Sequence, residues 1–225
     1  DTSGSIISLN EQTGKVEVLK AGGPVTITAR KQAEGGYSET TATWTFSAEK
    51  KPVTAIVTAK NKEYDTKDTA ALVVTWPANS LLNGDNINLA SVLKGTFDDG
   101  NVGTDKTVTI SGTAPASDKY DISWNTTAIA SITPKTATVT GVLAKTDLEY
   151  TGQPQALVTE GTATGGNAAY SLDGISYTLN VPQETNAGTY TVWYKALADD
   201  RNYVDGPAAK VTVTISQKTL TLSPS

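Results

Sequence analysis

Three aspartates in one short segment are the residues with the clearest capacity for chemistry. Asp98, Asp99 and Asp105 lie in FDDGNVGTD. Carboxylates are hard oxygen ligands, and Ca²⁺ takes about six to eight oxygens, backbone carbonyls included. The spacing is not that of an EF-hand loop, and DDGN is a strong hairpin-turn signal. We therefore expect a solvated turn without a metal ion, and calcium is the alternative.

Other kinds of reactive site are limited by what the sequence lacks. The chain has no Cys, His or Met, which excludes thiolate chemistry and imidazole ligands and disfavours a transition-metal site. Paired carboxylates could perform glycoside hydrolysis, but no Asp or Glu lies in a pattern that indicates burial. The segment ADDRNYVDG (198–206) is also acidic, and we expect Arg201 to pair with a neighbouring carboxylate. A lysine condensed with an Asn or Asp into an isopeptide bond is a further alternative.

Aromatic side chains are the next candidates, because sugar-binding modules stack pyranose rings on exposed Trp and Tyr. All four tryptophans lie in strand-like alternation, where packing in a core or between modules is the default; they are Trp44, Trp76, Trp124 and Trp193. Five tyrosines crowd the last part of the chain, at 170, 177, 190, 194 and 203. Tyr190 and Tyr194 have the opposite parity to Trp193, so one set is buried and the other available. A carbohydrate surface, if the chain has one, is expected there.

Strands must position all these residues. Alternation of β-branched or aromatic residues with polar ones predicts half-buried strands; it occurs in KVEVLK, VTITAR, TATWTF, AALVVTW, TVTISG, TATVTGV, TYTVWYKA and AKVTVTIS. Turn-forming Gly, Asn, Asp and Pro separate these runs. Only residues 80–95 could hold a helical turn. The fold class predicted is all-β.

An internal repeat organises the strands. KEYDTKDTA (62–70) and LEYTGQPQA (148–156) both place Glu-Tyr before a polar turn. A strand end followed by a lysine recurs near Lys50, Lys135 and Lys218, which gives modules of about 84 residues, a normal size for a β-sandwich. The two Glu-Tyr stretches then lie at equivalent positions, as early turns of successive modules.

Charge and hydropathy narrow the classes of partner. The net charge of −5 and the lack of a basic run argue against nucleic acid and anionic membrane surfaces. No apolar run approaches the roughly 18 residues that span a bilayer, and the start does not resemble a signal peptide. We expect a soluble fragment of a mature chain, without direct membrane insertion.

Several motifs resemble modules of bacterial surface proteins. Residues 6–50, with TGKV, KAGGPVTITA and a Y…A segment, resemble the C-terminal half of a bacterial immunoglobulin-like group 2 domain. Residues 52–135, with KEYDTKDTA and GTFDDGNVGTDKTVTISG, resemble a YDG-type repeat, although Thr66 stands where that family usually has Gly. Residues 137–216, with LEYTGQPQALV, YSLDGISYT and NAGTYTVWYKALADDRNY, resemble an MBG-type repeat.

The resemblance implies tandem immunoglobulin-like β-sandwich modules in an elongated arrangement. The expected division is 1–50, a partial module, then 51–135 and 136–218, with 219–225 beginning a further repeat. It implies no catalytic residue, cofactor or metal.

The expected function is a non-enzymatic spacer of an adhesin-like protein that is extracellular, secreted or attached to the cell wall. Its partners are then neighbouring domains of the parent chain. The alternative is a module that binds carbohydrate or glycoprotein, with host or cell-wall glycans as partners. The short connections predict semi-rigid junctions. Residues 1–50 hold too few strands for a closed core, so they should pack on the next module or pair with another chain.

Overall fold

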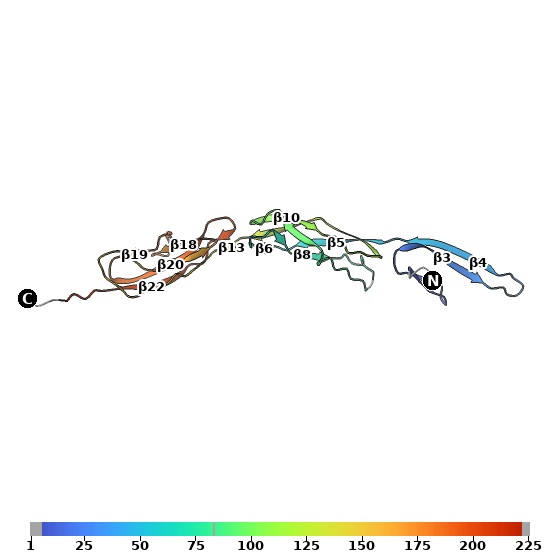
Figure 1. Ribbon diagram of the computed structural model, residues 1–225, viewed down its shortest axis with the longest axis horizontal. Coiled ribbons are helices and arrows are strands. Elements are labelled where there is room, and N and C mark those ends of the chain that lie inside the picture. The colour runs from blue at the N-terminus through green and yellow to red at the C-terminus, as the bar shows by residue number, and fades with distance from the viewer. Residues whose placement is uncertain (1–5, 83, 222–225) are drawn as a thin grey trace, which may run out of the picture. The chain divides into compact units, whose positions relative to one another are not determined.

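The computed structural model describes residues 6–82 and 84–221. The described chain contains strands and no helix (Figure 1), and therefore no membrane-spanning helix. The strands are β1 (Ile7–Asn10), β2 (Lys15–Val18), β3 (Gly22–Lys31), β4 (Thr40–Ala48), β5 (Lys51–Ala59), β6 (Lys62–Glu63), β7 (Thr69–Ala70), β8 (Leu72–Thr75), β9 (Lys94–Phe97), β10 (Gly103–Ser111), β11 (Tyr120–Trp124), β12 (Thr127–Thr133), β13 (Lys135–Thr136), β14 (Thr138–Thr140), β15 (Leu148–Glu149), β16 (Gln155–Ala156), β17 (Thr162–Thr164), β18 (Gly166–Ser171), β19 (Gln183–Glu184), β20 (Gly188–Ala198), β21 (Tyr203–Val204) and β22 (Ala209–Ser216).

These strands confirm the all-β prediction. Six of the eight alternating runs lie on single strands, and AALVVTW and TATVTGV are each divided between two strands. β-Branched residues at every second position suit a pleated surface with one buried face. The described residues of 80–95 contain no helix. They hold one bond of α-helical spacing, from the Leu93 N–H to the Leu89 carbonyl at 3.0 Å.

The strands form several separate sheets. Three of them contain more than two strands, in the orders β6-β12-β10-β9-β7, β11-β5-β8 and β15-β22-β20-β18. The two-stranded sheets are β1-β2, β3-β4, β13-β21, β14-β17 and β16-β19. Most pairs are antiparallel, but β5-β11, β6-β12, β13-β21 and β15-β22 are parallel.

The chain divides into two compact units, which are described separately. Among the described residues the first contains 6–60, 71–96 and 108–128, and the second contains 61–70, 97–107 and 129–221. The predicted module boundaries near residues 51 and 136 stay predictions. Part of the predicted further repeat, residues 222–225, lies outside the described residues.

The core of the first unit lies around β5. Inward-facing Ala55 and Val57 pack with Leu89, Leu93 and Ile110. Trp76 and Trp124 pack against this cluster, as expected for tryptophans in strand alternation. The indole N–H of Trp76 donates to the Ile87 carbonyl at 3.2 Å, which satisfies its only polar group.

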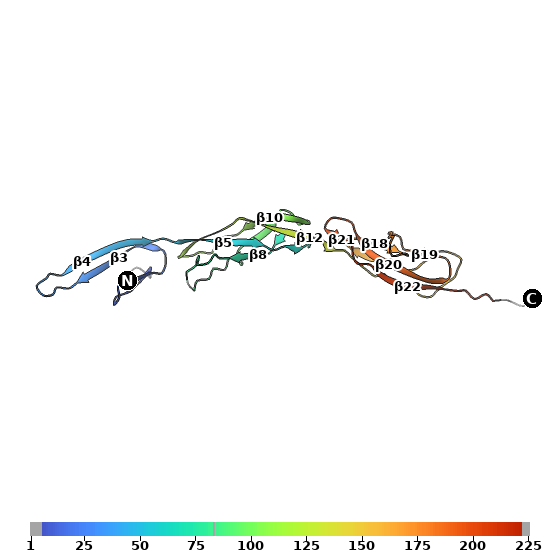
Figure 2. The same cartoon turned by 180° about the vertical axis from the view of Figure 1, so that it is seen from behind.

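The core of the second unit lies along β20, which pairs with β18 on one side and β22 on the other (Figures 1 and 2). Val192 contributes from β20 and Val213 from β22, with Leu157, Tyr170 and Ile215 also buried. Tyr190 and Tyr194 pack against this cluster. This confirms the part of the parity prediction that concerns the tyrosines, since both lie on the core side of the strand.

Residues 6–50 form two hairpins, β1-β2 and β3-β4, and no closed sandwich. Their only buried hydrophobic side chains are Ile7 and Val25. The Ala21 N–H donates to the Asp118 carbonyl at 2.8 Å within the first unit. This bond matches the expectation that the segment rests on residues of the following module.

Candidate functional site

The acidic turn that suggested calcium is held by a lysine. Lys106 Nζ lies 2.7 Å from Asp98 Oδ1 and 3.0 Å from Asp99 Oδ1. The Lys106 side chain is only 9% exposed, whereas both aspartates are about half exposed. Asp99 Oδ1 also accepts the Asn101 N–H at 2.7 Å, so the carboxylates fold the turn as well as pair with the lysine.

The electrostatics of this turn agree with an ion pair. Hydrogen bonds from Lys106 lower the pKa of Asp98 and of Asp99, and the two carboxylates raise the pKa of Lys106. Asp105 does not join them; it has φ of 50°, and its N–H donates to Ser131 Oγ at 3.1 Å. The structure thus does not assemble the three aspartates into a ligand set, and the described chain contains no cluster of three acidic side chains suited to a metal.

The tip of the same turn contacts a residue about a hundred positions further along the chain, within the second unit. The Val102 N–H donates to Asn202 Oδ1 at 2.9 Å, and Asn202 Nδ2 donates to Asn101 Oδ1 at 3.2 Å. Asn202 is 7% exposed, so both bonds lie largely away from water. We call Tyr64, Asn101, Val102, Asn202 and Tyr203 the junction cluster.

The backbone of Asn202 is also fully engaged. Its N–H donates to Asp200 Oδ1 at 2.6 Å, and its carbonyl accepts the Lys135 N–H at 3.0 Å. A buried amide is stable only when its polar atoms find partners, and all four groups of Asn202 do so. No pattern in the sequence marks this residue, because its partners come from a distant turn.

An aromatic contact completes the junction cluster. The Tyr64 and Tyr203 rings meet edge to face, with centroids 5.4 Å apart. Tyr203 also lies directly against Gly165, where φ is 80° and an added Cβ would fall 2.2 Å from Tyr203 Cδ1. Glycine is therefore required at position 165 by both the backbone conformation and the space.

The expected pairing of Arg201 with a carboxylate is wrong for the described residues. Among the ion pairs of residues 6–82 and 84–221, the acidic partner in this segment is Asp205, which Lys195 contacts at 2.9 Å. Asp205 Oδ1 also accepts the Ala198 N–H at 3.0 Å, which ties the loop to the end of β20.

The two Glu-Tyr stretches are structurally equivalent, as the repeat predicted. β6 runs parallel to β12, and the Tyr64 N–H donates to the Thr133 carbonyl at 2.9 Å. β15 runs parallel to β22, and the Tyr150 N–H donates to the Ser216 carbonyl at 2.9 Å. Each stretch thus pairs in parallel with a strand that lies about 65 to 70 residues further along, a long-range closure of the kind that costs loop entropy.

The turns after these tyrosines also match. Asp65 Oδ1 accepts the Lys67 N–H at 3.0 Å, and Thr151 Oγ1 accepts the Gln153 N–H at 3.3 Å. The residue between acceptor and donor has positive φ in both turns, 69° at Thr66 and 76° at Gly152. The residue at the expected YDG-type glycine position, Thr66, therefore has a left-handed backbone, although its side chain is β-branched.

The other two tryptophans, Trp44 and Trp193, lie outside the two core clusters. Trp193 is on the outer face, but Gly174 lies on its ring and the Lys210 ammonium is 4.9 Å from its centroid, so the ring is covered. Trp44 is 62% exposed, which contradicts the packing expected for it. It stacks on Phe46, with centroids 4.6 Å apart, on the apolar face of the β3-β4 hairpin.

The loop that covers Trp193 is folded by one carboxylate. Asp173 accepts hydrogen bonds from Ser171 Oγ at 2.6 Å and from the N–H groups of Ile175 and Ser176 at 2.7 and 2.8 Å. These donors, the Ser171 hydroxyl first, hold the pKa of Asp173 well below its usual range. The loop geometry thus depends on an ionised aspartate.

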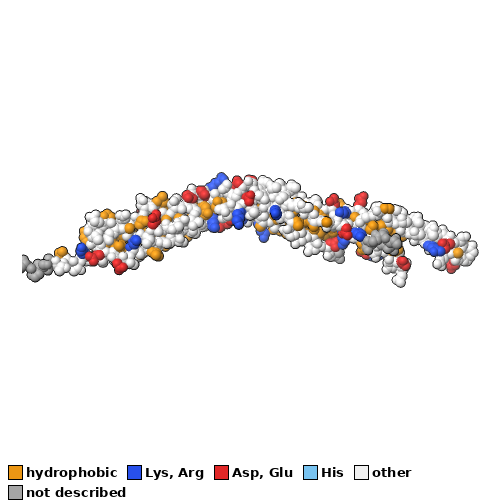
Figure 3. Space-filling view, in the orientation of Figure 1, with side chains coloured by type: hydrophobic (Ala, Val, Ile, Leu, Met, Phe, Trp, Pro, Cys, Tyr) orange, Lys and Arg blue, Asp and Glu red, His pale blue; other side chains and the backbone are white. Residues whose placement is uncertain are grey.

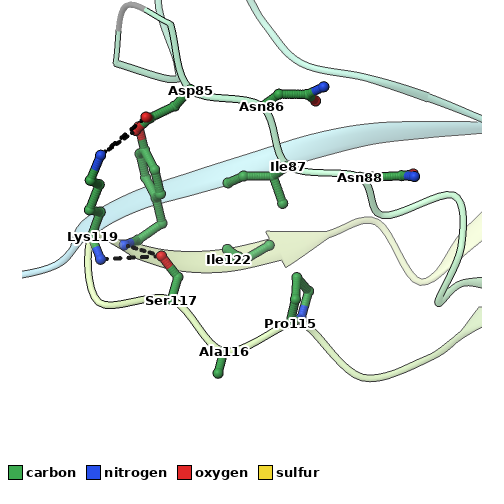
Figure 4. Close-up of a pocket in the computed structure, with 10 residues that line it drawn as sticks. Asp85, Asn86, Ile87, Asn88, Pro115, Ala116, Ser117, Lys119 and Ile122 are labelled. Carbon is green, nitrogen blue, oxygen red and sulfur yellow. Dashed lines mark hydrogen bonds and ion pairs between the residues drawn. The ribbon is translucent and has the colours of Figure 1, made fainter.

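A shallow cleft of about 320 Å³ lies in the first unit, between the 85–88 and 115–122 segments (Figure 4). Lys119 Nζ lies 3.1 Å from Asp85 Oδ1, and the Tyr120 hydroxyl donates to Asp85 Oδ2 at 2.6 Å. The same tyrosine oxygen accepts the Leu82 N–H at 2.8 Å. These contacts fix Leu82 and Asp85 to β11.

The lysine–aspartate contacts bear on the isopeptide alternative. Condensation requires a neutral amine that attacks a carboxyl carbon and releases water. Asp85 raises the pKa of Lys119, and the hydrogen bonds from Tyr120 and Lys119 lower the pKa of Asp85. The protonated amine has no lone pair for attack, so this contact is an ion pair.

Comparisons with known proteins identify one segment. Residues 49–128 match the family model of the YDG domain. This confirms the YDG part of the resemblance, including the segment that contains Thr66. Nothing among the curated proteins matches. A solved structure of fibronectin(III)-like modules of Clostridium thermocellum CbhA has 15% sequence identity and a TM-score of 0.28, and the match covers 72% of this chain and 94% of that chain. At this TM-score the likeness indicates neither a shared arrangement nor a function.

Proposed function

We propose that the chain is a non-catalytic spacer of a bacterial cell-surface or secreted multi-domain protein. The observation that carries the proposal is the junction cluster, which joins the turn at 98–103 to the segment at 200–204 by side-chain hydrogen bonds. A flexible linker would lack such contacts. The hydrogen bonds of a buried asparagine are directional. When all of its polar groups are paired, they specify one arrangement of the segments that the asparagine joins.

The charged turn supports the same role. Lys106 holds Asp98 and Asp99, and Asp99 in turn holds the Asn101 N–H. These contacts within the turn preorganise it for its hydrogen bonds to Asn202, which lowers the conformational entropy lost when the junction cluster forms. The acidic segment in which the sequence suggested a calcium ligand is thus proposed to shape the turn that contacts Asn202.

The repeated Glu-Tyr turns support a tandem architecture beyond the YDG match. Because both turns make the same backbone bonds, the segment after residue 136 is proposed to be a second module of related design, of the MBG type. Residues 6–50 are proposed to be part of an immunoglobulin-like group 2 domain. An adhesin-like parent protein outside the cell is proposed as the setting, with neighbouring domains of that chain as partners.

Distance measurement across the junction cluster tests the spacer. The chain has no cysteine, so Lys67→Cys and Thr189→Cys, both at exposed positions, give two defined spin-label sites. Pulsed electron paramagnetic resonance is expected to give a narrow distance distribution. Asn202→Ala should broaden it, while Asn180→Ala, at an exposed asparagine, should leave it unchanged. A broad distribution in the unmodified chain would refute a fixed junction.

A glycan-binding module is the second candidate, and one observation favours it. Trp44 and Tyr37 are exposed, at 62% and 80%, on the β3-β4 hairpin, to which no other strand of residues 6–82 and 84–221 is paired. Exposed aromatic rings can stack on sugar rings, although the expected location in the last module is not supported, because Trp193 is covered. A glycan array with the full chain and with Trp44→Ala decides; signal lost in the variant would support binding.

A further inference from the structure

The strand pairing at the two ends of residues 135–216 determines how this segment responds to a pulling force. The first strand of this segment, β13, runs parallel to β21, with Lys135 opposite Tyr203 and Thr136 opposite Val204. The Lys135 and Ala137 N–H groups also donate to the Asn202 and Val204 carbonyls, at 3.0 and 2.9 Å. The N-terminal end of residues 135–216 therefore lies beside β21, the strand that precedes the last strand, β22.

The chain leaves this segment at the opposite end of the last strand. β22 pairs with β20 from Ala209 opposite Tyr194 to Ile215 opposite Gly188. The β21 strand, which holds the incoming chain, is followed directly by the Ala209 end of β22, and the chain departs at the Ser216 end. A pull on the two ends of residues 135–216 therefore acts along β22, as its course in Figures 1 and 2 also shows.

A second parallel pair lies at the departing end. β15 pairs with β22 through Leu148 opposite Ile215 and Glu149 opposite Ser216. The Tyr150 N–H donates to the Ser216 carbonyl at 2.9 Å, and Ser216 Oγ donates to the Leu148 carbonyl at 2.9 Å. Ile215 is buried, so sliding β22 would also drag an apolar side chain out of the core.

The direction of the pulling force relative to the strands determines how the hydrogen bonds between them break. When the pull runs along a strand, neighbouring hydrogen bonds across it are stretched together, so several must break in the same event. When the pull runs across the strands, the bonds at one end carry the load and break one after another. Forced unfolding is governed by the unfolding rate, so the first case gives a higher force at equal thermodynamic stability.

We propose that residues 135–216 form a load-bearing clamp, in which the parallel pairs β13-β21 and β15-β22 and the long β20-β22 pair resist tension applied along the chain. The inference rests on the proposed spacer function, since a spacer between domains is the element through which tension would pass. The clamp adds a property that a spacer does not need, namely a resistance to unfolding that depends on the direction of the pulling force.

Single-molecule force spectroscopy with two attachment geometries tests the clamp. In the first, handles at the two chain ends load residues 135–216 along β22. In the second, handles on Thr189→Cys and Thr214→Cys pull opposite residues of β20 and β22 apart across the sheet. Both positions are exposed, and the cysteine-free chain makes the attachment specific. Release of residues 135–216 should lengthen the chain by roughly 270–300 Å before subtraction of the folded length.

The axial unfolding force is expected to be at least two-fold higher than the transverse force. Tyr150→Pro removes the N–H that donates to Ser216 and should lower the axial force while leaving the transverse force unchanged. Tyr150→Ala keeps that N–H and removes only the side chain, so it should keep the axial force. Circular dichroism checks the fold of each variant. If Tyr150→Pro does not fold, Ser216→Ala replaces it, with Thr212→Ala on the same strand as its control.

Equal forces in the two directions would overturn the clamp, as would an axial force that Tyr150→Pro and Ser216→Ala both leave unchanged. The spin-label distances separate this failure from failure of the spacer. A narrow distance distribution with equal forces refutes the clamp and supports the spacer. A broad distribution with direction-dependent forces supports the clamp and refutes the spacer.

Discussion

Thr66 holds a backbone conformation that favours glycine, and Thr66→Gly is expected to stabilise the chain. Its φ is 69°, in the left-handed region, and its β-branched side chain is exposed. The equivalent residue in the later Glu-Tyr turn is Gly152, with φ of 76°. The same turn thus occurs in this chain with and without a side chain at the strained position.

The magnitude follows from two opposing effects. The left-handed conformation costs an L-residue about 1–2 kcal/mol, which Thr66→Gly removes. Glycine gives the unfolded chain more freedom, which costs about 0.4–1 kcal/mol. Since the exposed Thr66 side chain loses little packing, the net gain lies between about 0 and 1.6 kcal/mol, with a midpoint near 0.8 kcal/mol. For a module of about 84 residues the midpoint raises the melting temperature by about 3–6 °C.

Differential scanning calorimetry of the full chain measures the shift. Thr66→Ala is the matched control, because alanine removes the threonine side chain but keeps the strain, so it should not raise the melting temperature. Gly152→Thr is the reciprocal change and should destabilise; an added Cβ there meets only the Tyr150 hydroxyl, at 3.8 Å, so the cost comes from the backbone. A lower melting temperature for Thr66→Gly, or a higher one for Gly152→Thr, would refute the reasoning.

The remaining predictions concern packing, charge and pH. Gly165→Ala places a Cβ inside the Tyr203 ring and should cost about 1–3 kcal/mol from overpacking in addition to the strain; Gly141→Ala, also at positive φ but with open space, should cost only the strain, and equal losses in denaturant melts would contradict the contact. The double change Asp98→Asn and Asp99→Asn should lower the melting temperature because it leaves a buried lysine without its carboxylates, whereas calcium should not change the melt of the unmodified chain; a calcium-dependent rise that the double change abolishes would restore the metal site. The pKa of Asp173 is lowered in the folded chain, so its stabilisation is complete above the ordinary aspartate value of about 3.9 and is lost as pH falls through the folded value. The difference in melting temperature between the unmodified chain and Asp173→Asn should therefore shrink below about pH 4, and a constant difference from pH 7 to pH 2 would disprove it.

Local sequence patterns predicted the strands. The features that they did not predict depend on contacts between residues far apart in the sequence. Period-2 alternation and turn residues act over a few positions, so TYTVWYKA and AKVTVTIS could be assigned to strands, and the equivalence of the two Glu-Tyr stretches followed from the repeat. Asn202 could not be found, because it bonds to Asn101 and Val102 through the fold alone. The Lys106 ion pairs are local, and DDGN with a lysine across the hairpin was a usable signal for them.

The tryptophans show the same limit. Alternation indicates which residues share a face, and this placed Trp193 opposite Tyr190 and Tyr194. It does not indicate what covers the face. Gly174 covers Trp193 from a loop some twenty residues away, while Trp44 has no such cover among the described residues. The sequence alone pointed to the last module for an exposed aromatic surface, whereas the strongly exposed rings of Tyr37 and Trp44 lie on the β3-β4 hairpin.

The two parallel closures have a consequence for folding from the unfolded chain. The Tyr64 and Tyr150 bonds to Thr133 and Ser216 use backbone atoms only, so hydrogen bonding does not by itself stop the first strands of one repeat from pairing with the last strand of the other. Tandem repeats are prone to such misassembly. Side chains must supply the discrimination, and here they differ: Leu148 faces the buried Ile215 strand end, whereas Lys62 takes the corresponding place opposite Ile132. We therefore expect the divergence between the repeats to disfavour pairing of the first strand of one repeat with the last strand of the other during folding.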